Sequence, residues 1–178
     1  MSESVKLDAL EVAELVNESL LNNSTAQAKL IELTQNKLFK FCVLLGNNRE
    51  QAEDLCQESY VKAFISLTKL SDPKSFYPWL CQIAKNQFYD NRRKYKDSLA
   101  KQADQIEDEA DFSDPAYESI LMIRKILASF DEDSKFLLLM VELEGMSYSE
   151  AAEVLKTSED AVRSKLHRLR QEFIKKMK

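Results

Sequence analysis

Residues 145–174 read GMSYSEAAEVLKTSEDAVRSKLHRLRQEFI, a pattern that predicts two helices joined by a short polar turn. The first helix is expected to begin at Ser149, and residues 156–158 are expected to form the turn. Either Thr157 or Ser158 is suited to cap the second helix, because a hydroxyl oxygen can accept from the free N–H groups of its first turn. The two acidic residues that follow lie where the helix dipole favours negative charge. This arrangement indicates a helix-turn-helix.

The second of these helices has one apolar face and one basic face. The apolar residues recur at helical spacing and form a single stripe: Val162, Leu166, Leu169 and Phe173. The opposite face carries side chains that can bind phosphates and base edges: Arg163, Ser164, Lys165, His167, Arg168 and Arg170. In a helix-turn-helix such a face enters the DNA major groove, whereas an ordinary helical hairpin would leave it solvated. Residues 163–178 hold seven Lys or Arg against one acidic residue, which favours DNA binding.

The composition places the chain among soluble, mostly helical proteins. Of its 178 residues 44% are hydrophobic and 31% are charged, and only two glycines and three prolines interrupt it. So few breakers favour long helices over a many-stranded sheet. The net charge of −5 does not exclude nucleic-acid binding, because the basic and acidic residues are segregated along the chain.

The cysteines and the hydropathy indicate a cytoplasmic location. Cys42, Cys56 and Cys81 are odd in number, show no CxxC spacing and lie in apolar helical patterns, so we expect reduced core thiols. No apolar run approaches the roughly 18 residues of a membrane span, and the first residues lack the basic region of a signal peptide. We therefore expect no membrane insertion.

The first half of the chain predicts four helices, at about residues 6–21, 25–45, 49–70 and 76–96. Gly46 is expected to cap the second helix, and residues 71–75 form a loop before the fourth. From Cys81 to Lys96 the fourth helix carries five basic residues against one acid, interleaved with aromatic and amide side chains. Such a surface suits single-stranded or melted nucleic acid, whose bases stack and whose phosphates need neutralisation.

An acidic segment follows that helix. Between Asp97 and Glu118 there are eight acidic residues against Lys101 alone, with low apolar content, which indicates a flexible linker over residues 97–116. The sequence thus predicts an all-α protein with two small helical domains, residues 1–96 and 117–178, and a helix-turn-helix in the second. In that second domain, the apolar run at residues 136–141 is better read as a core helix than as a strand.

Two basic helical modules joined by an acidic linker resemble the extracytoplasmic-function (ECF) sigma factors, the smallest sigma-70 type subunits of bacterial RNA polymerase. The resemblance covers about residues 27–96 and 117–175. In the first block it rests on LLGNNREQAEDLCQESYVKAF and SFYPWLCQIAKNQFYDNRR, and in the second on LEGMSYSEAAEVL and AVRSKLHRLR.

The resemblance implies a subunit that binds core RNA polymerase, directs it to promoter DNA and helps to melt that DNA. Polymerase would be bound by residues that, without the resemblance, look like an ordinary solvated face: Asp54, Gln57, Glu58 and Lys62. The −10 element would be bound by Leu70, Lys74, Ser75, Asn86, Arg92 and Arg93. The −35 element would be read by Arg163, Ser164, Lys165, His167 and Arg168. An anti-sigma factor is a further implied partner.

Two other functions fit parts of the sequence. A helix-turn-helix regulator would have no need of the basic and amide residues at 70–96, and a sigma mimic that titrates an anti-sigma factor would have weakened basic surfaces. We expect neither catalysis nor a cofactor or metal, because His167 is the only histidine and no phosphate loop, nucleophile motif or metal-ligand spacing is present. One departure from the family is Lys156, which stands where glycine is usual in the turn.

Overall fold

The computed structural model describes residues 8–45, 48–98 and 122–177, and every regular element within those ranges is helical. The predicted all-α fold is therefore confirmed for this part of the chain. The proposed cap at Gly46 and the predicted linker beyond Ser98 lie outside the described residues.

The N-terminal half contains four α-helices, which match the predicted number. Their bounds are α1 Ala9–Leu20, α2 Ser24–Leu45, α3 Arg49–Ile65 and α4 Phe76–Ser98. Two short 3-10 helices lie between α3 and α4, η1 at Leu67–Lys69 and η2 at Pro73–Ser75. Helix α1, for which the sequence indicated no role, packs on α2 and η2 and buries Val12, Leu15 and Val16.

Helix α3 is shorter than predicted, because a side-chain hydrogen bond ends it. It starts at a capping box, in which the Asn48 side chain accepts from the Gln51 N–H at 2.8 Å and the Gln51 side chain accepts from the Asn48 N–H. At the other end, the Ser66 hydroxyl donates to the Lys62 carbonyl at 2.6 Å, and the chain tightens into η1. The prediction that this helix runs to residue 70 was therefore wrong by about one turn.

The C-terminal half is also helical. Its elements are a helix at 122–127, α6 Glu132–Leu138, a π-helical turn η3 Leu139–Leu143, α7 Tyr148–Leu155 and α8 Glu159–Met177. The apolar run at 136–141 is helical, as predicted. Helix α7 begins one residue earlier than expected, because Ser147 and Glu150 form a capping box that the sequence reading missed.

The turn of the helix-turn-helix has the predicted geometry. Lys156 ends α7 in the left-handed region with φ of 52°, the conformation that glycine adopts most readily. Ser158 is the cap of α8, since its hydroxyl oxygen accepts from the Ala161 N–H at 3.2 Å.

Lys156→Gly should stabilise the protein by about 0.5–1 kcal/mol, because a left-handed conformation costs a side-chain-bearing residue about 1–2 kcal/mol and glycine's greater unfolded entropy offsets part of that gain. Urea denaturation would measure the change. Asn22→Gly is the matched control: Asn22 has φ of 62°, but asparagine tolerates this conformation, so its replacement should change stability less. A destabilised Lys156→Gly protein would contradict the prediction.

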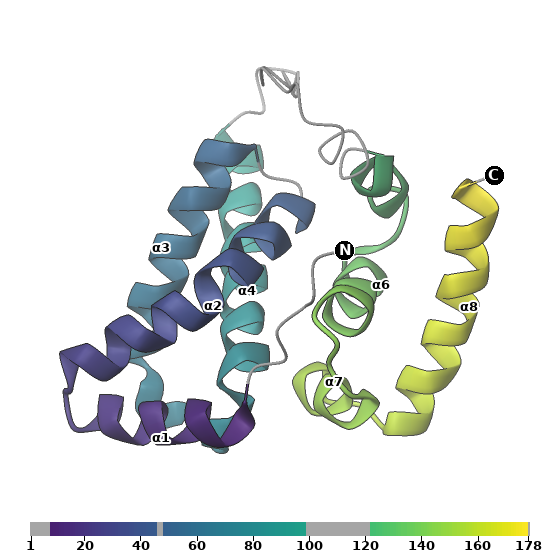
Figure 1. The fold of residues 1–178 in the computed structure, drawn as a ribbon. Coiled ribbons are helices and arrows are strands. Elements are labelled where there is room, and N and C mark those ends of the chain that lie inside the picture. The colour runs from purple at the N-terminus through teal and green to yellow at the C-terminus, as the bar shows by residue number, and fades with distance from the viewer. Residues whose placement is uncertain (1–7, 46–47, 99–121, 178) are drawn as a thin grey trace.

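The two halves lie side by side (Figure 1), and their buried side chains form one hydrophobic core. Phe41 of α2 and Phe136 of α6 are fully buried and meet edge to face, with ring centroids 5.7 Å apart. Helix α4 contacts α7, and α2 contacts η3. The sequence predicted the two domains but not this interface between them.

Polar contacts also cross the interface. The Tyr77 hydroxyl donates to Glu144 Oε2 at 2.6 Å, and burial raises the pKa of the Glu144 carboxyl. The Lys135 ammonium donates to the carbonyl of Leu45 at the end of α2, where a cation is favoured. Burial, followed by the charges of Arg124 and Arg92, lowers the pKa of Lys135 to about 8.

Candidate nucleic-acid interface

Helix α8 presents the predicted basic face. Val162, Leu166 and Leu169 are buried, and Phe173 is half-buried, so the apolar stripe anchors the helix as expected. The exposed side chains on the opposite face are Arg163, Ser164, His167 and Arg168, while Lys165 is half-buried. All five predicted −35 residues thus lie on one helix that a folded hairpin holds at the surface.

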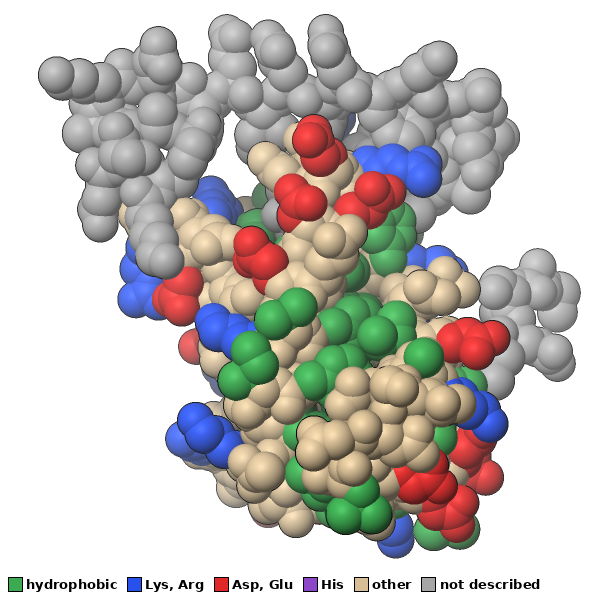
Figure 2. All heavy atoms as spheres, turned by 90° about the vertical axis from the view of Figure 1, so that its left-hand side faces the viewer, with side chains coloured by type: hydrophobic (Ala, Val, Ile, Leu, Met, Phe, Trp, Pro, Cys, Tyr) green, Lys and Arg blue, Asp and Glu red, His purple; other side chains and the backbone are tan. Residues whose placement is uncertain are grey.

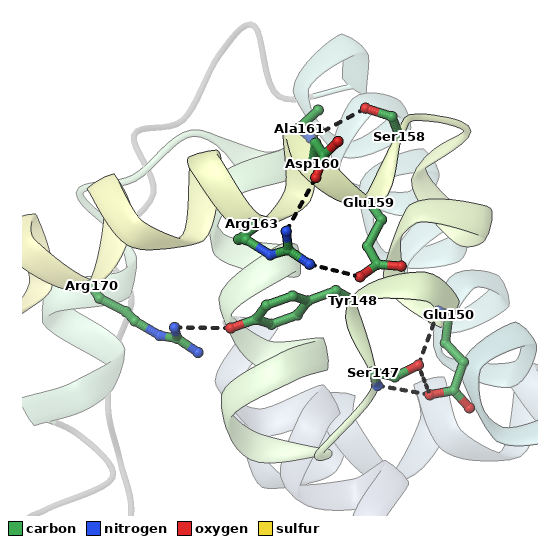
Figure 3. Close-up of polar contacts among 9 residues, drawn as sticks. All are labelled: Ser147, Tyr148, Glu150, Ser158, Glu159, Asp160, Ala161, Arg163 and Arg170. Atoms are coloured by element: carbon green, nitrogen blue, oxygen red, sulfur yellow. Dashed lines mark hydrogen bonds and ion pairs between the residues drawn. The ribbon is translucent and has the colours of Figure 1, made fainter.

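Arg163 is held by the acidic residues that begin α8 (Figure 3). Its guanidinium donates to Glu159 Oε1 at 3.0 Å and to Asp160 Oδ1 at 3.2 Å. All three side chains are at least half exposed, so these ion pairs are weak and their geometry matters more than their energy. The two carboxylates orient the Arg163 guanidinium, whereas the Ser158 hydroxyl caps the helix.

Arg170 does not belong to the free basic face, contrary to the prediction. Its guanidinium donates to the Tyr148 hydroxyl at 3.1 Å, as Figure 3 shows. It also donates to Glu142 Oε1 at 2.8 Å. The residue ties α8 to α7 and to the turn before it. Helical spacing placed Arg170 on the same face as Arg163, but only the folded structure shows that Glu142 and Tyr148 bind its guanidinium.

The loop before α4 holds Leu70, Lys74 and Ser75 in a compact arrangement. The Asp72 carboxylate accepts from the Lys74 N–H at 3.0 Å and from the Ser75 hydroxyl at 3.4 Å. Leu70 and Ser75 are half-buried, and the Lys74 side chain is exposed. Helix α1 packs against η2 and so holds the loop in place.

Helix α4 exposes the amide and basic residues that were predicted to bind the −10 element. Asn86 is exposed and accepts from the Gln82 side chain at 3.1 Å. Arg92 lies over the Phe88 ring, 5.6 Å from its centroid, and Arg93 pairs with Asp90 at 2.6 Å. Lys85 precedes Asn86, but its ammonium is already bound by Asp133 at 2.7 Å.

Helix α3 exposes Asp54, Gln57, Glu58 and Lys62 together. Two apolar side chains share this face and were missed by the sequence reading, Val61 at 60% exposure and Ile65 at 79%. Figure 2 shows this side of the molecule, with acidic side chains above hydrophobic ones. The sequence could have indicated this exposed pair, because Val61 and Ile65 are four residues apart and lie outside the buried stripe of α3. An exposed apolar patch beside charges is typical of a protein-binding surface.

The described residues show neither a metal centre nor a membrane span. Within them, no group of three His, Cys, Asp or Glu side chains could hold a metal ion. None of the helices in this part of the chain is long and apolar enough to cross a membrane. Cys42, Cys56 and Cys81 are buried and unbridged, as predicted.

Comparison with known proteins identifies both halves. The family model for Sigma-70 region 2 matches residues 30–98, and the model for Sigma-70, region 4 matches residues 120–173. The chain belongs to the ECF sigma factors of the sigma-70 family. As a sigma factor it is a transcription initiation factor and not an enzyme.

Curated relatives differ in how much of their length this sigma factor spans. It is 30% identical over 134 residues to the RNA polymerase sigma factor NccH of Alcaligenes xylosoxydans xylosoxydans, covering 70% of this chain and 72% of NccH. It is 27% identical over 149 residues to the ECF RNA polymerase sigma factor SigM of Bacillus subtilis, covering 80% of this chain and 90% of SigM. The chain spans only 38% of the probable RNA polymerase sigma factor RfaY of Xanthomonas campestris pv. campestris, with 29% identity and 82% of this chain covered.

Solved structures share the fold. CnrH, in complex with the cytosolic domain of CnrY, superposes with a TM-score of 0.73 and 23% identity, over 93% of this chain and 95% of CnrH. RpoE of Bartonella quintana, in complex with the anti-sigma factor NepR, gives a TM-score of 0.64 and 21% identity, over 84% of this chain and 95% of RpoE.

Proposed function

We propose that this sigma factor binds core RNA polymerase through α3 and directs it to promoters by holding a −10 element on α4 and reading a −35 element with α8. The observation that carries this proposal is that each matched sigma-70 region exposes a set of suitable side chains on one helix. We propose three segments on the same basis: residues 1–96 bind polymerase and the −10 element, 97–116 link the domains, and 117–178 read the −35 element. The protein acts in the cytoplasm, where polymerase and promoters are found.

The polymerase-binding surface is α3. Asp54, Gln57, Glu58 and Lys62 supply charge and hydrogen-bonding groups, and Val61 with Ile65 supplies apolar area that becomes buried on docking. Interfaces of this kind draw most of their affinity from a buried apolar centre with a polar rim. The exposed pair therefore supports protein binding by this face better than simple solvation does.

The −10 surface combines the loop of Leu70, Lys74 and Ser75 with Asn86, Arg92 and Arg93 of α4. The loop offers a hydroxyl and an ammonium at a supported corner, suited to a displaced base and its phosphate. On α4 the arginines can neutralise phosphates of a separating strand, while the amide of Asn86 can pair with a base edge.

Run-off transcription with core polymerase and a promoter library is the direct test. The protein should yield discrete transcripts that core polymerase alone does not make, and their upstream sequences should share two elements. A matched variant, Val61→Asp with Ile65→Asp, should lose transcription while keeping its fold, because both side chains are exposed. Transcripts no different from those of core polymerase alone would contradict the proposed function.

Asn86→Ala should impair promoter opening more than closed-complex binding, because the amide can bind a displaced base edge but carries no charge. Permanganate reactivity of promoter thymines would measure opening, and filter binding would measure the closed complex. Gln82→Ala is the control, since it removes the observed partner of Asn86 but not the amide itself. Normal thymine reactivity in a stably folded Asn86→Ala protein would remove this residue from the −10 surface.

We propose an anti-sigma factor as a further partner. Two structures that share this fold are complexes, one with the cytosolic domain of CnrY and one with the anti-sigma factor NepR. A sigma mimic that never binds DNA remains a poorer account of this chain, because both basic helices keep exposed arginines.

A further inference from the structure

An acidic turn begins α6 and lies between the two DNA-binding helices. It consists of Asp131, Glu132 and Asp133, all exposed. Asp131 is the helix cap, and its carboxylate accepts from the Ser134 N–H at 2.9 Å. The cap fixes the turn, so its carboxylates have defined positions relative to neighbouring helices.

One of these carboxylates forms an ion pair with a lysine of α4, the helix proposed to bind the −10 element. The Lys85 ammonium donates to Asp133 Oδ1 at 2.7 Å and lies 4.6 Å from the centroid of the Phe136 ring. Only 11% of the Lys85 side chain is exposed. A lysine of α4 that could meet a phosphate is thus both covered and neutralised by the C-terminal domain.

Another carboxylate faces a lysine of the −35 helix. The Lys165 ammonium lies 4.0 Å from Asp131 Oδ1. Lys85, Lys165 and Asp133 line the same cleft, of about 370 Å³, between α4 and the helix-turn-helix. A single acidic turn therefore approaches one basic residue of each helix that is proposed to bind DNA.

The interface between the domains holds the turn in this position. Phe136, one helical turn after Asp133, is buried against Phe41, and the Tyr77 to Glu144 hydrogen bond closes the other side. Contact of Lys85 with Asp133 requires this packing, because the two residues belong to different domains. A contact of Lys85 with a DNA phosphate requires the ion pair to break, since carboxylate and phosphate oxygens compete for the same ammonium.

We propose that the acidic turn of residues 131–133 is a built-in competitor of promoter DNA, which masks Lys85 and Lys165 in a closed form of the free protein until polymerase separates the domains. The inference rests on the proposed function, because it takes α4 and α8 as the DNA-binding helices. It assigns the competition for DNA to two ion contacts of the packed C-terminal domain, Lys85 with Asp133 and Lys165 with Asp131.

The test uses the full-length protein without polymerase and four variants: two single Asp changes, the two combined, and a control. Asp133→Asn frees Lys85, and Asp131→Asn weakens the Lys165 contact while asparagine keeps the helix cap. The control carries Glu32→Gln and Glu153→Gln, which remove the same charge as the two Asp changes together, lie outside the acidic turn and break no ion pair among the described residues. The probes are a labelled single-stranded oligonucleotide of mixed sequence and its duplex, followed by fluorescence anisotropy at fixed salt.

The two single variants should differ in which probe they bind more tightly. Asp133→Asn should raise single-strand affinity about two- to fivefold, because Lys85 is on the helix suited to melted DNA. Asp131→Asn should raise duplex affinity by a smaller factor, as expected for a 4.0 Å contact. The control should change neither beyond the effect of net charge, and an equal gain in the control and in the two Asp variants combined would overturn the proposal.

Chemical labelling of Lys85 gives a readout that does not depend on DNA. Acylation by an amine-reactive ester, followed by peptide mass spectrometry, should be slow at Lys85 in the wild type and faster in Asp133→Asn or when core polymerase is added. Labelling of Lys85 at the same rate in all samples would contradict the closed form. If the run-off assay failed but Lys85 stayed protected, the fault would lie with the proposed function and not with the closed form.

Discussion

Phe136→Ala should lower the free energy of unfolding by about 3–5 kcal/mol, one of the largest effects expected from a single substitution in this protein. The Phe136 ring is fully buried, meets Phe41 edge to face and lies beneath the Lys85 ammonium. Alanine would remove most of this contact and leave a cavity that two packed helices cannot readily close. The loss should appear in both domains, because the ring belongs to α6 and its principal neighbour belongs to α2.

Chemical denaturation followed by two probes would measure this effect. Trp79 is the only tryptophan, so its fluorescence reports on the N-terminal domain, while circular dichroism reports on all helices. In Phe136→Ala the Trp79 transition should move to lower denaturant although the substitution is in the C-terminal domain. Leu143→Ala, at an exposed position of the same segment, is the control and should change stability by no more than about 0.5 kcal/mol. An unchanged Trp79 transition would show that the domains unfold independently.

The helices were predictable because their apolar residues follow a period near 3.6. Leu30, Leu38 and Phe41 in α2, and Val162 with Leu166 in α8, are buried as that period indicates. Boundaries were less certain, since they depend on single hydrogen bonds. The Ser66 bond that ends α3 and the Ser147 cap that starts α7 compete with the periodic pattern and prevail only in the folded geometry.

The interface between the domains could not be predicted from the sequence. Periodicity shows that Phe41 and Phe136 are each buried, but a stripe of apolar residues does not identify the surface that covers it. Tyr77 and Glu144 are 67 residues apart, and nothing in their local sequence indicates a hydrogen bond. For the same reason, the sequence did not show that Arg170 and Lys85 have partners. Their helical spacing places them on an exposed face, but acidic residues of other helices bind them.

The candidate site was predictable to the extent that it depends on helix faces and family resemblance. Asp54, Asn86 and Arg163 all lie on exposed faces, as expected. The ion pairs of Arg163 were not predicted, because the sequence indicated only that Glu159 and Asp160 lie where the helix dipole favours negative charge. In the structure Ser158 is the cap, one of the two residues expected, and both carboxylates accept from the Arg163 guanidinium.

The ion pairs of Arg163 help to predict how substitutions of Arg163 and Lys176 should differ in their effect on DNA binding. Arg163 lies in the second turn of α8, where its guanidinium can exchange two weak carboxylate contacts for guanine O6 and N7. Lys176 lies at the far end of α8, 3.5 Å from Glu172 and 5.4 Å from the Phe130 ring centroid. From there it can reach only phosphate. Exposed ion pairs contribute about 0–1 kcal/mol, so breaking those of Arg163 does not cancel a good base contact.

Arg163→Ala should therefore change which −35 sequences are used, and Lys176→Ala should change only the strength of binding. Loss of the base contact should cost about 1–3 kcal/mol and relax preference at one position of the element. Loss of a phosphate contact should weaken all sequences alike and reduce the salt dependence by about one unit of slope. Competition among a −35 library, with the polymerase complex and at two salt concentrations, measures both quantities. Equal selectivity in the two variants would show that Arg163 contacts phosphate or solvent, and base reading would then fall to Ser164, His167 or Arg168, the exposed side chains that follow it along α8.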